Sequence, residues 1–228
     1  MKNKAKRLLD EIEYEAKCTA TFTGRKTFSQ AVMNAIREVA REKFVPVASR
    51  LYAYENRPLT IGHGQTISQP YIVALMTDLL DLTSDSNVLE VGTGSGYQAA
   101  ILSLLAKKVY SIETIGPLFE SASKRLIKLG YTNIEAHQCN GYEGWKEKAP
   151  FDAIIVTAAA THIPQALVDQ LKPGGRMVIP VGLPCMSQEL MLLTKNNEGN
   201  TSVKAVLSVA FVPLVDDKES NKGKDNLE

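Results

Sequence analysis

The sequence has few cysteines and no excess of charge of either sign. Its 228 residues include three cysteines, Cys18, Cys139 and Cys185, which lie far apart and form no C-x-x-C pair. This number and spacing argue against a disulfide framework and against a zinc ribbon. The 26 Lys and Arg residues balance 25 Asp and Glu residues, so the net charge of +1 gives no electrostatic basis for nucleic-acid binding.

Long hydrophobic runs are also absent. No segment approaches the roughly 18 consecutive apolar residues that a membrane span requires. The basic N-terminus is followed by Asp10 and Glu11, which interrupt the apolar stretch that a secretion signal would need. We therefore expect a cytoplasmic protein that does not contact membranes. Apolar residues still make up 44% of the chain, which excludes global disorder and provides for a packed core.

Residues 1–60 are expected to form a helical cap that belongs to the same domain as the rest of the chain. Apolar residues recur at helical spacing over residues 8–16 and again behind Ser29, which is a suitable N-cap. Residues 19–24 are β-branched and contain glycine, so we expect a loop there. The second helix should end near Phe44, because a proline follows two residues later.

From residue 70 onward the pattern alternates between helices and short apolar strands. Strands separated by single helices indicate right-handed βαβ units and a parallel sheet. The segments 188–194 and 203–212 are separated only by a polar loop, so we expect an antiparallel hairpin at the end of the sheet. Residues 216–228 are polar and should form a flexible tail. The expected parallel strands are 87–91, 109–113, 134–139, 153–157 and, after a turn at 173–175, 176–181.

A glycine-rich loop directly follows the first of these strands. Gly92, Gly94 and Gly96 permit positive φ and close approach of a ligand to a helix N-terminus. Compared with the dinucleotide fingerprint G-x-G-x-x-G, the third glycine comes one residue early. Glu90 adds a negative charge, which suits a cationic ligand better than a pyrophosphate, and Glu113 ends the next strand, where a carboxylate can bind ribose hydroxyls. S-adenosylmethionine, a sulfonium without phosphate, fits these charges.

The loop together with Glu113 resembles the S-adenosylmethionine-dependent class I methyltransferases. Further segments, within about residues 29–215, resemble one family of that class, the protein-L-isoaspartate (D-aspartate) O-methyltransferases. The segment Gln65–Tyr71 is specific to this family, as is the closing Phe211–Leu214. The other matching segments are Arg41–Val45, Ile61–Gly64, Phe151–Ala159, Leu171–Arg176 and Pro180–Gly182.

The resemblance implies an α/β fold with a doubly wound, mainly parallel, seven-stranded Rossmann-like sheet, in a methyltransferase domain over residues 61–215. It implies methyl transfer from S-adenosylmethionine to the carboxylate of L-isoaspartyl residues in damaged proteins and peptides, with S-adenosylhomocysteine as the other product. Activity on D-aspartyl residues is left open. We expect a monomer without a metal. Ser68 matches the family's active-site serine, and the implied cofactor-binding residues are Gln65, Thr66, Ile67, Glu90, Gly92, Thr93, Gly94, Gly96, Glu113, Thr114, Asn140 and Gly141.

Two features depart from the family pattern. Asn140 stands where the family usually has an aspartate that receives the adenine amino group. The amide oxygen of asparagine can accept the same hydrogen bond without charge assistance, so we expect weaker cofactor binding rather than none. Residues 16–28 form a longer region than in the bacterial relatives, and this leaves the docking of that region open.

The residue types alone favour Ser68 as the N-cap of a helix that begins near Pro70, a role compatible with an active-site position. Methylation of a carboxylate needs no general base, because the acid is already ionised at neutral pH. His63 lies in the same loop and is a further candidate for ligand contact. Three alternatives stay open from the sequence: a class I methyltransferase with another substrate, an NAD-dependent oxidoreductase, and a catalytically silent cofactor-binding module.

Overall fold

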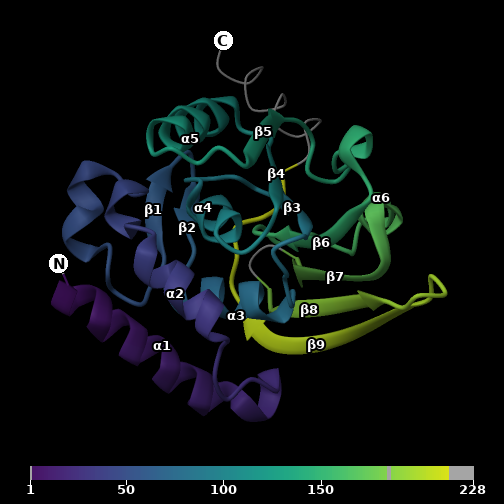
Figure 1. Ribbon diagram of the computed structural model, residues 1–228, viewed down its shortest axis with the longest axis horizontal. Helices are drawn as coiled ribbons and strands as arrows, with labels where there is room; N and C mark the ends of the chain where they lie inside the picture. The colour runs from purple at the N-terminus through teal and green to yellow at the C-terminus, as the bar shows by residue number, and fades with distance from the viewer. Residues whose placement is uncertain (1, 184–185, 216–228) are drawn as a thin grey trace.

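A seven-stranded sheet forms the centre of the computed structural model, which describes residues 2–183 and 186–215 (Figure 1). The strand order is β5-β4-β3-β6-β7-β8-β9. Strands β3 to β7 pair in parallel, and β8 and β9 continue the sheet as an antiparallel hairpin, as the sequence predicts. The bounds are β3 (Asn87–Val91), β4 (Lys108–Glu113), β5 (Ile134–Gln138), β6 (Phe151–Val156), β7 (Leu171–Val181), β8 (Gln188–Lys195) and β9 (Thr201–Val209). The tail expected over residues 216–228 lies outside the described residues.

The central strands of the sheet are buried on both faces, which confirms the doubly wound architecture. Successive side chains of β3 point to opposite sides, so Val88 joins one hydrophobic cluster and Leu89 the other. This burial explains why the segment Ala153–Val156 of β6 is a continuous apolar run without alternation. The helices are α1 (Lys2–Thr23), α2 (Gln30–Glu38), α3 (Pro70–Leu79), α4 (Tyr97–Ser103), α5 (Gly116–Lys128) and α6 (Gln165–Gln170), with 3₁₀ turns at Arg41–Lys43, Val47–Tyr52 and Lys146–Lys148.

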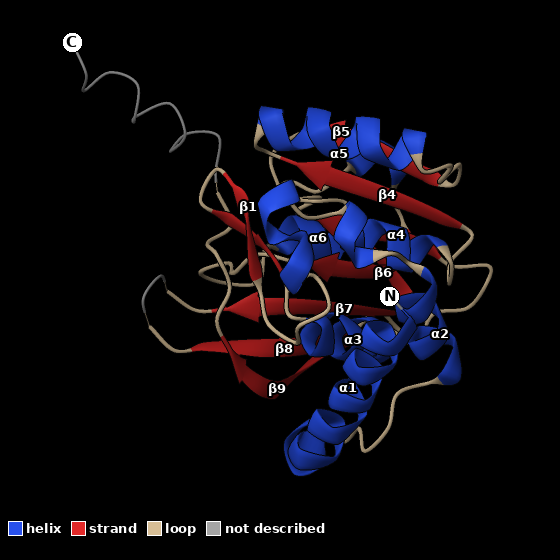
Figure 2. Ribbon diagram, turned by 90° about the vertical axis from the view of Figure 1, so that its left-hand side faces the viewer, coloured by secondary structure: helices blue, strands red, loops and turns tan. Residues whose placement is uncertain are grey.

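The N-terminal helices share their hydrophobic core with the sheet. Leu8 and Ile12 of α1 and Ile36 of α2 belong to the same buried cluster as Val88 of β3. In Figures 1 and 2, α1 and α2 lie beside α3 rather than apart from it. A small antiparallel sheet of β1 (Leu59–Gly62) and β2 (Gln65–Ile67) connects this region to α3. None of the described helices has the length and apolarity that crossing a membrane would require.

The structure corrects two helix boundaries. The prediction of a loop over residues 19–24 is wrong, because α1 continues to Thr23. The hydroxyls of Thr19 and Thr23 donate to the carbonyls four residues earlier, at 2.9 and 3.2 Å. The Thr19 hydroxyl also lies 2.6 Å from that of Tyr71, and this tertiary contact outweighs the low helix propensity of threonine. The second helix ends at Glu38 rather than near Phe44, because Val39 adopts an extended backbone.

Strand β7 is longer than expected. It begins at Leu171 and therefore includes Pro173, Gly174 and Gly175, which the sequence indicates as a turn before the strand. Pairing with β6 is irregular at this point, since Phe151 faces Leu171 whereas Ala153 faces Arg176. The glycines are accommodated as a bulge, a common use of glycine within strands. The rest of β7 matches the predicted strand.

Asp78 should be important for the stability of the cap. This buried carboxylate of α3 forms an ion pair with Arg25 at 3.1 Å and accepts a hydrogen bond from the Ser29 backbone amide at 2.8 Å. We expect Asp78→Ala to lower the free energy of unfolding by about 2 kcal/mol, because both partners lose their acceptor in a largely buried place. Urea denaturation measures this, with exposed Asp10→Ala on α1 as control. A loss no larger than that of the control would contradict the assignment.

Candidate active site

The carboxyl ends of β3, β4 and β6 meet around the glycine loop. Gly92 has φ +96°, and a Cβ added there would lie 2.4 Å from the Oγ1 atom of Thr157, which follows β6. That hydroxyl donates to the Gly92 carbonyl at 2.7 Å, while the Gly92 amide donates to the Ile112 carbonyl of β4 at 2.8 Å. The loop is therefore held from both neighbouring strands, and only glycine fits at its first position.

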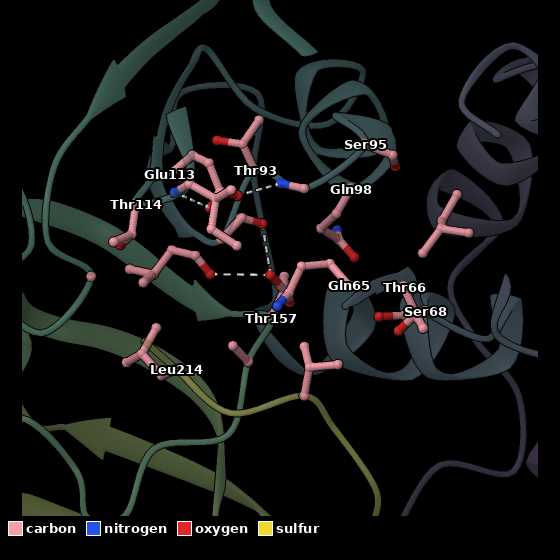
Figure 3. Close-up of a pocket in the computed structure, with 18 of the residues that line it drawn as sticks. Gln65, Thr66, Ser68, Thr93, Ser95, Gln98, Glu113, Thr114, Thr157 and Leu214 are labelled. Atoms are coloured by element: carbon pink, nitrogen blue, oxygen red, sulfur yellow. Dashed lines mark hydrogen bonds between the residues drawn. The ribbon is translucent and has the colours of Figure 1, made fainter. Parts of the chain in front are cut away.

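Glu113 at the end of β4 lies across from this loop (Figure 3). Its Oε2 atom accepts a hydrogen bond from the Gly94 amide at 2.8 Å, and its Oε1 atom accepts one from the Ile115 amide at 2.9 Å. The parallel register of β3 and β4 places both strand ends at one edge of the sheet. The carboxylate is thereby fixed at the mouth of the loop, with lone pairs left for a ligand's hydroxyls.

These elements enclose what we call the central cavity. Of its described lining residues none is a lysine, arginine or histidine, and Glu113 is the one acidic residue. The walls come from the glycine loop, the end of β4, the segment after β6, residues 212–215, and the β2–α3 segment. The predicted site residues that line it are Gln65, Thr66, Ile67, Ser68, Gly92, Thr93, Gly94, Glu113, Thr114 and Gly141.

A second depression, which we call the side groove, adjoins the central cavity and has a volume of about 430 Å³. Thr66 and Ser68 line both, so the two spaces meet at the β2–α3 segment. Glu15 of α1 lines the groove on one side, and residues 207–211 at the end of β9 line it on the other. Ser68 therefore stands where the central cavity and the side groove meet.

Ser68 does not cap α3, contrary to the interpretation from residue types. The helix begins at Pro70, as predicted, and its N-cap is Gln69, which makes no side-chain capping bond. Instead the Gln69 side chain donates to the Glu15 carboxylate at 3.0 Å. The Ser68 hydroxyl is thus not required to satisfy the helix terminus, and it lines the cavity and the groove.

Glu90 lies behind the wall of the central cavity rather than on it. Its carboxyl group is fully buried and accepts a hydrogen bond from the Ser111 hydroxyl, which in turn lies 2.6 Å from the Thr93 hydroxyl of the glycine loop. Burial raises the pKa of Glu90 to about 8; Ser111 opposes this effect and the charge of Glu113 adds to it. The sequence argument that Glu90 presents a charge to the ligand therefore does not match its placement, since it contacts the loop through Ser111.

Gly96 and Asn140 also lie outside the cavity lining. Gly96 adopts φ +83° as the N-cap of α4, and a Cβ there would meet Leu126 of α5 at 3.2 Å, so it permits close helix packing. The Asn140 Oδ1 atom accepts a hydrogen bond from the Tyr142 amide at 2.9 Å, which shapes the turn that carries Gly141. A Cβ at Gly141 would lie 2.8 Å from Leu214, so this turn closes tightly against the cavity wall.

Several lining residues were not predicted as site residues. Thr157 follows β6, which pairs with β3, so the rule that ligands bind at the carboxyl ends of parallel strands could have identified it. Gln98 of α4 also lines the cavity, and its amide donates to Thr77 at 3.0 Å. Nothing in its spacing marks it. His63 occupies the β1–β2 turn with φ +52° and does not line the cavity, and no cluster of metal-ligating residues occurs in the described part of the chain.

The parallel sheet carries a glycine loop after its central strand and a carboxylate at the end of the adjacent strand, beside a cavity whose described lining has no basic residue. This combination is typical of the S-adenosylmethionine-dependent class I methyltransferases. Comparisons with known proteins narrow this class. The model of the family described as "Protein-L-isoaspartate(D-aspartate) O-methyltransferase (PCMT)" matches residues 20–219. The chain belongs to this family.

Named relatives and solved structures agree with this assignment. The chain is 58% identical over 208 residues to protein-L-isoaspartate O-methyltransferase 2 of Syntrophobacter fumaroxidans, covering 91% of this chain and 84% of the relative. It is 56% identical to the protein of that name from Polaromonas sp., covering 91% and 98%. A Plasmodium falciparum structure, titled a putative protein-L-isoaspartate O-methyltransferase in complex with S-adenosyl-L-homocysteine, matches with a TM-score of 0.76 at 26% identity, covering 92% of this chain and 97% of that one.

The raised pKa of Glu90 predicts a pH-dependent difference in stability between the wild type and Glu90→Gln. Between about pH 5 and pH 8 the folded protein keeps the Glu90 proton, whereas the unfolded chain, with its carboxyl near the ordinary value of 4.5, has released it. The folded state binds more protons, so the wild type should lose stability relative to the variant as pH rises, by at most about 1.4 kcal/mol per pH unit.

Urea denaturation at several pH values measures this difference. Glu13→Gln on the exposed face of α1 serves as the control and should follow the wild type. A difference between wild type and Glu90→Gln that stays constant from pH 5 to pH 8 would show that Glu90 titrates normally in the folded protein.

Proposed function

We propose that this chain transfers a methyl group from S-adenosylmethionine to the carboxylate of L-isoaspartyl residues in damaged proteins and peptides. The substrate is supported by the family match over residues 20–219. The donor is supported by the central cavity, which combines a single carboxylate, Glu113, with the absence of lysine, arginine and histidine from its described lining. A pyrophosphate would meet no cationic side chain in this lining, whereas a ribose and a sulfonium are compatible with a nearby carboxylate. The family match over residues 20–219 and the glycine spacing disfavour the NAD-dependent alternative.

The donor's binding site is assigned to residues on the three strand ends. Glu113 would accept hydrogen bonds from the ribose hydroxyls, and the loop from Gly92 to Gly96 would lie against the methionine part. The turn of Asn140 and Gly141 would border the adenine, with Asn140 acting through the backbone geometry that it supports. Glu90 would act indirectly, by holding Thr93 through Ser111. When bound, the donor supplies an electrophilic methyl group on a sulfonium sulfur.

The substrate would bind along the side groove with its carboxylate at Ser68. The groove and the cavity share Thr66 and Ser68, so a peptide in the groove can reach the donor's methyl group at this junction. The carboxylate is ionised at neutral pH and attacks without a general base. Ser68 would orient it by a hydrogen bond, and the rate would come from holding the reacting atoms together. The products are a neutral methyl ester and S-adenosylhomocysteine.

The organisation of the chain is part of the proposal. Residues 1–60 would form a cap within one domain rather than a separate unit, because α1 and α2 share a buried cluster with the sheet. We further propose that the chain acts as a monomer. The exposed thiol of Cys18 supports a reducing compartment, so we propose the cytoplasm.

Two synthetic peptides that differ only in an isoaspartyl or aspartyl linkage test the substrate. Transfer of labelled methyl from S-adenosylmethionine should occur to the isoaspartyl peptide and be at least about a hundredfold slower with the aspartyl peptide, because only one linkage places its carboxylate at Ser68. Equal labelling of both peptides would favour a methyltransferase with another substrate. No labelling combined with donor binding would favour a silent module.

Ser68→Ala should lower kcat roughly tenfold to a hundredfold while leaving the Kd for S-adenosylmethionine within about threefold, because the serine is assigned to the substrate carboxylate. Steady-state kinetics and calorimetric titration measure the two quantities. Ser84→Ala, at an exposed position after α3, is the matched control and should resemble the wild type. An equal loss of turnover and of donor affinity would assign Ser68 to the donor site instead.

A further inference from the structure

Arg41 is a fully buried cation that forms no ion pair in the described part of the protein. It lies in a 3₁₀ turn after α2, and none of its surface reaches solvent. Its Nη2 atom donates to the Ser68 carbonyl at 2.8 Å, with a longer contact of 3.5 Å to the Arg57 carbonyl. Its Nε and Nη1 atoms make no hydrogen bond. The guanidinium also lies 4.9 Å from the centre of the Tyr97 ring.

This arrangement is unfavourable for folding. Burial lowers the pKa of Arg41, with Tyr97 acting in the opposite direction, yet an arginine keeps its charge in proteins. A buried charge without an ion pair destabilises the folded state, and an apolar side chain of similar volume is often as stable or more stable in such a place. A purely structural role therefore does not explain Arg41.

The position of the charge indicates its role. The guanidinium contacts the main chain of Ser68, the residue at the junction between cavity and groove. Of the other charged groups near this junction, Glu15 in the groove and Glu113 in the cavity are both acidic and would repel a substrate carboxylate. Arg41 is thus placed to offset this repulsion at the point where the carboxylate must bind.

We propose that Arg41 is a positioning residue that supplies the missing countercharge of the substrate carboxylate and fixes the Ser68 main chain beside it. This inference rests on the proposed function. The charge attracts the carboxylate and loses its partner when the neutral ester forms, so it favours bound substrate over bound product. Because the carboxylate's charge is already partly lost in the transition state, Arg41 contributes mainly to substrate binding, and its removal should affect KM more than kcat.

Kinetics of Arg41→Met test the inference. The KM for an isoaspartyl peptide should rise roughly tenfold to fiftyfold, as expected for losing a buried charge near the substrate carboxylate, with a smaller change in kcat. The Kd for S-adenosylmethionine should stay within about threefold. The inhibition constant of the methyl-ester peptide should be nearly the same for Arg41→Met as for the wild type. The variant should therefore bind substrate and product with similar affinity. Arg41→Lys keeps the charge and should recover a substantial part of the KM effect.

Stability separates this role from a structural one. The thermal midpoint of Arg41→Met should equal or exceed that of the wild type, and Arg37→Met on the exposed face of α2 should change neither stability nor kinetics. Three results would overturn the inference. Arg41→Met misfolds; its KM, kcat and donor affinity all worsen to a similar extent; or Arg41→Lys has a KM no better than that of Arg41→Met. If the wild type does not methylate the isoaspartyl peptide, the proposed function itself is wrong. If the wild type is active and the KM of Arg41→Met is unchanged, only the role of Arg41 is wrong.

Discussion

The close contact between Gly92 and Thr157 is the constraint on which the site depends. A side chain at Gly92 has no space, because its Cβ would lie 2.4 Å from the Thr157 hydroxyl. Without a side chain, the loop turns at positive φ and is held by β4 on one side and by Thr157 on the other. The same turn brings the Gly94 amide to Glu113 at 2.8 Å. Thr157, the Glu113 carboxylate and the glycine loop are therefore held together as one unit, which the register of the parallel strands positions.

The distribution of charge around this unit fits the proposed reaction. An acidic group lies on the donor side at Glu113, and a cationic group lies buried behind the substrate side at Arg41. The two reactants, a sulfonium and a carboxylate, would thus each face a complementary charge before their own charges cancel on methyl transfer. Neither group needs to gain or lose a proton, and this agrees with a site in which no base and nucleophile are paired.

Much of this could be predicted from the sequence. The apolar strands, the glycine spacing and Glu113 follow local rules of strand, turn and charge, and they lie where those rules place them. Three features depend on tertiary packing. The first is the extension of α1, where the Thr19 hydroxyl contacts that of Tyr71. The others are the position of Glu90 behind the cavity wall and the burial of Arg41 without an ion pair, which depends on the side chains around it. A sequence pattern indicates which residue types occur near a site, but it does not indicate whether a given side chain lines the cavity or lies buried behind its wall.

The loop beginning at Gly92 and the Glu113 carboxylate together form the proposed donor site. A crystal structure of the chain grown with S-adenosylhomocysteine tests it most directly. We predict that the ribose hydroxyls lie within hydrogen-bonding distance of the Glu113 carboxylate and that the amino-acid part of the ligand runs along the glycine loop towards Ser68. A ligand bound elsewhere in the molecule, or one in this cavity with its ribose turned away from Glu113, would contradict the account.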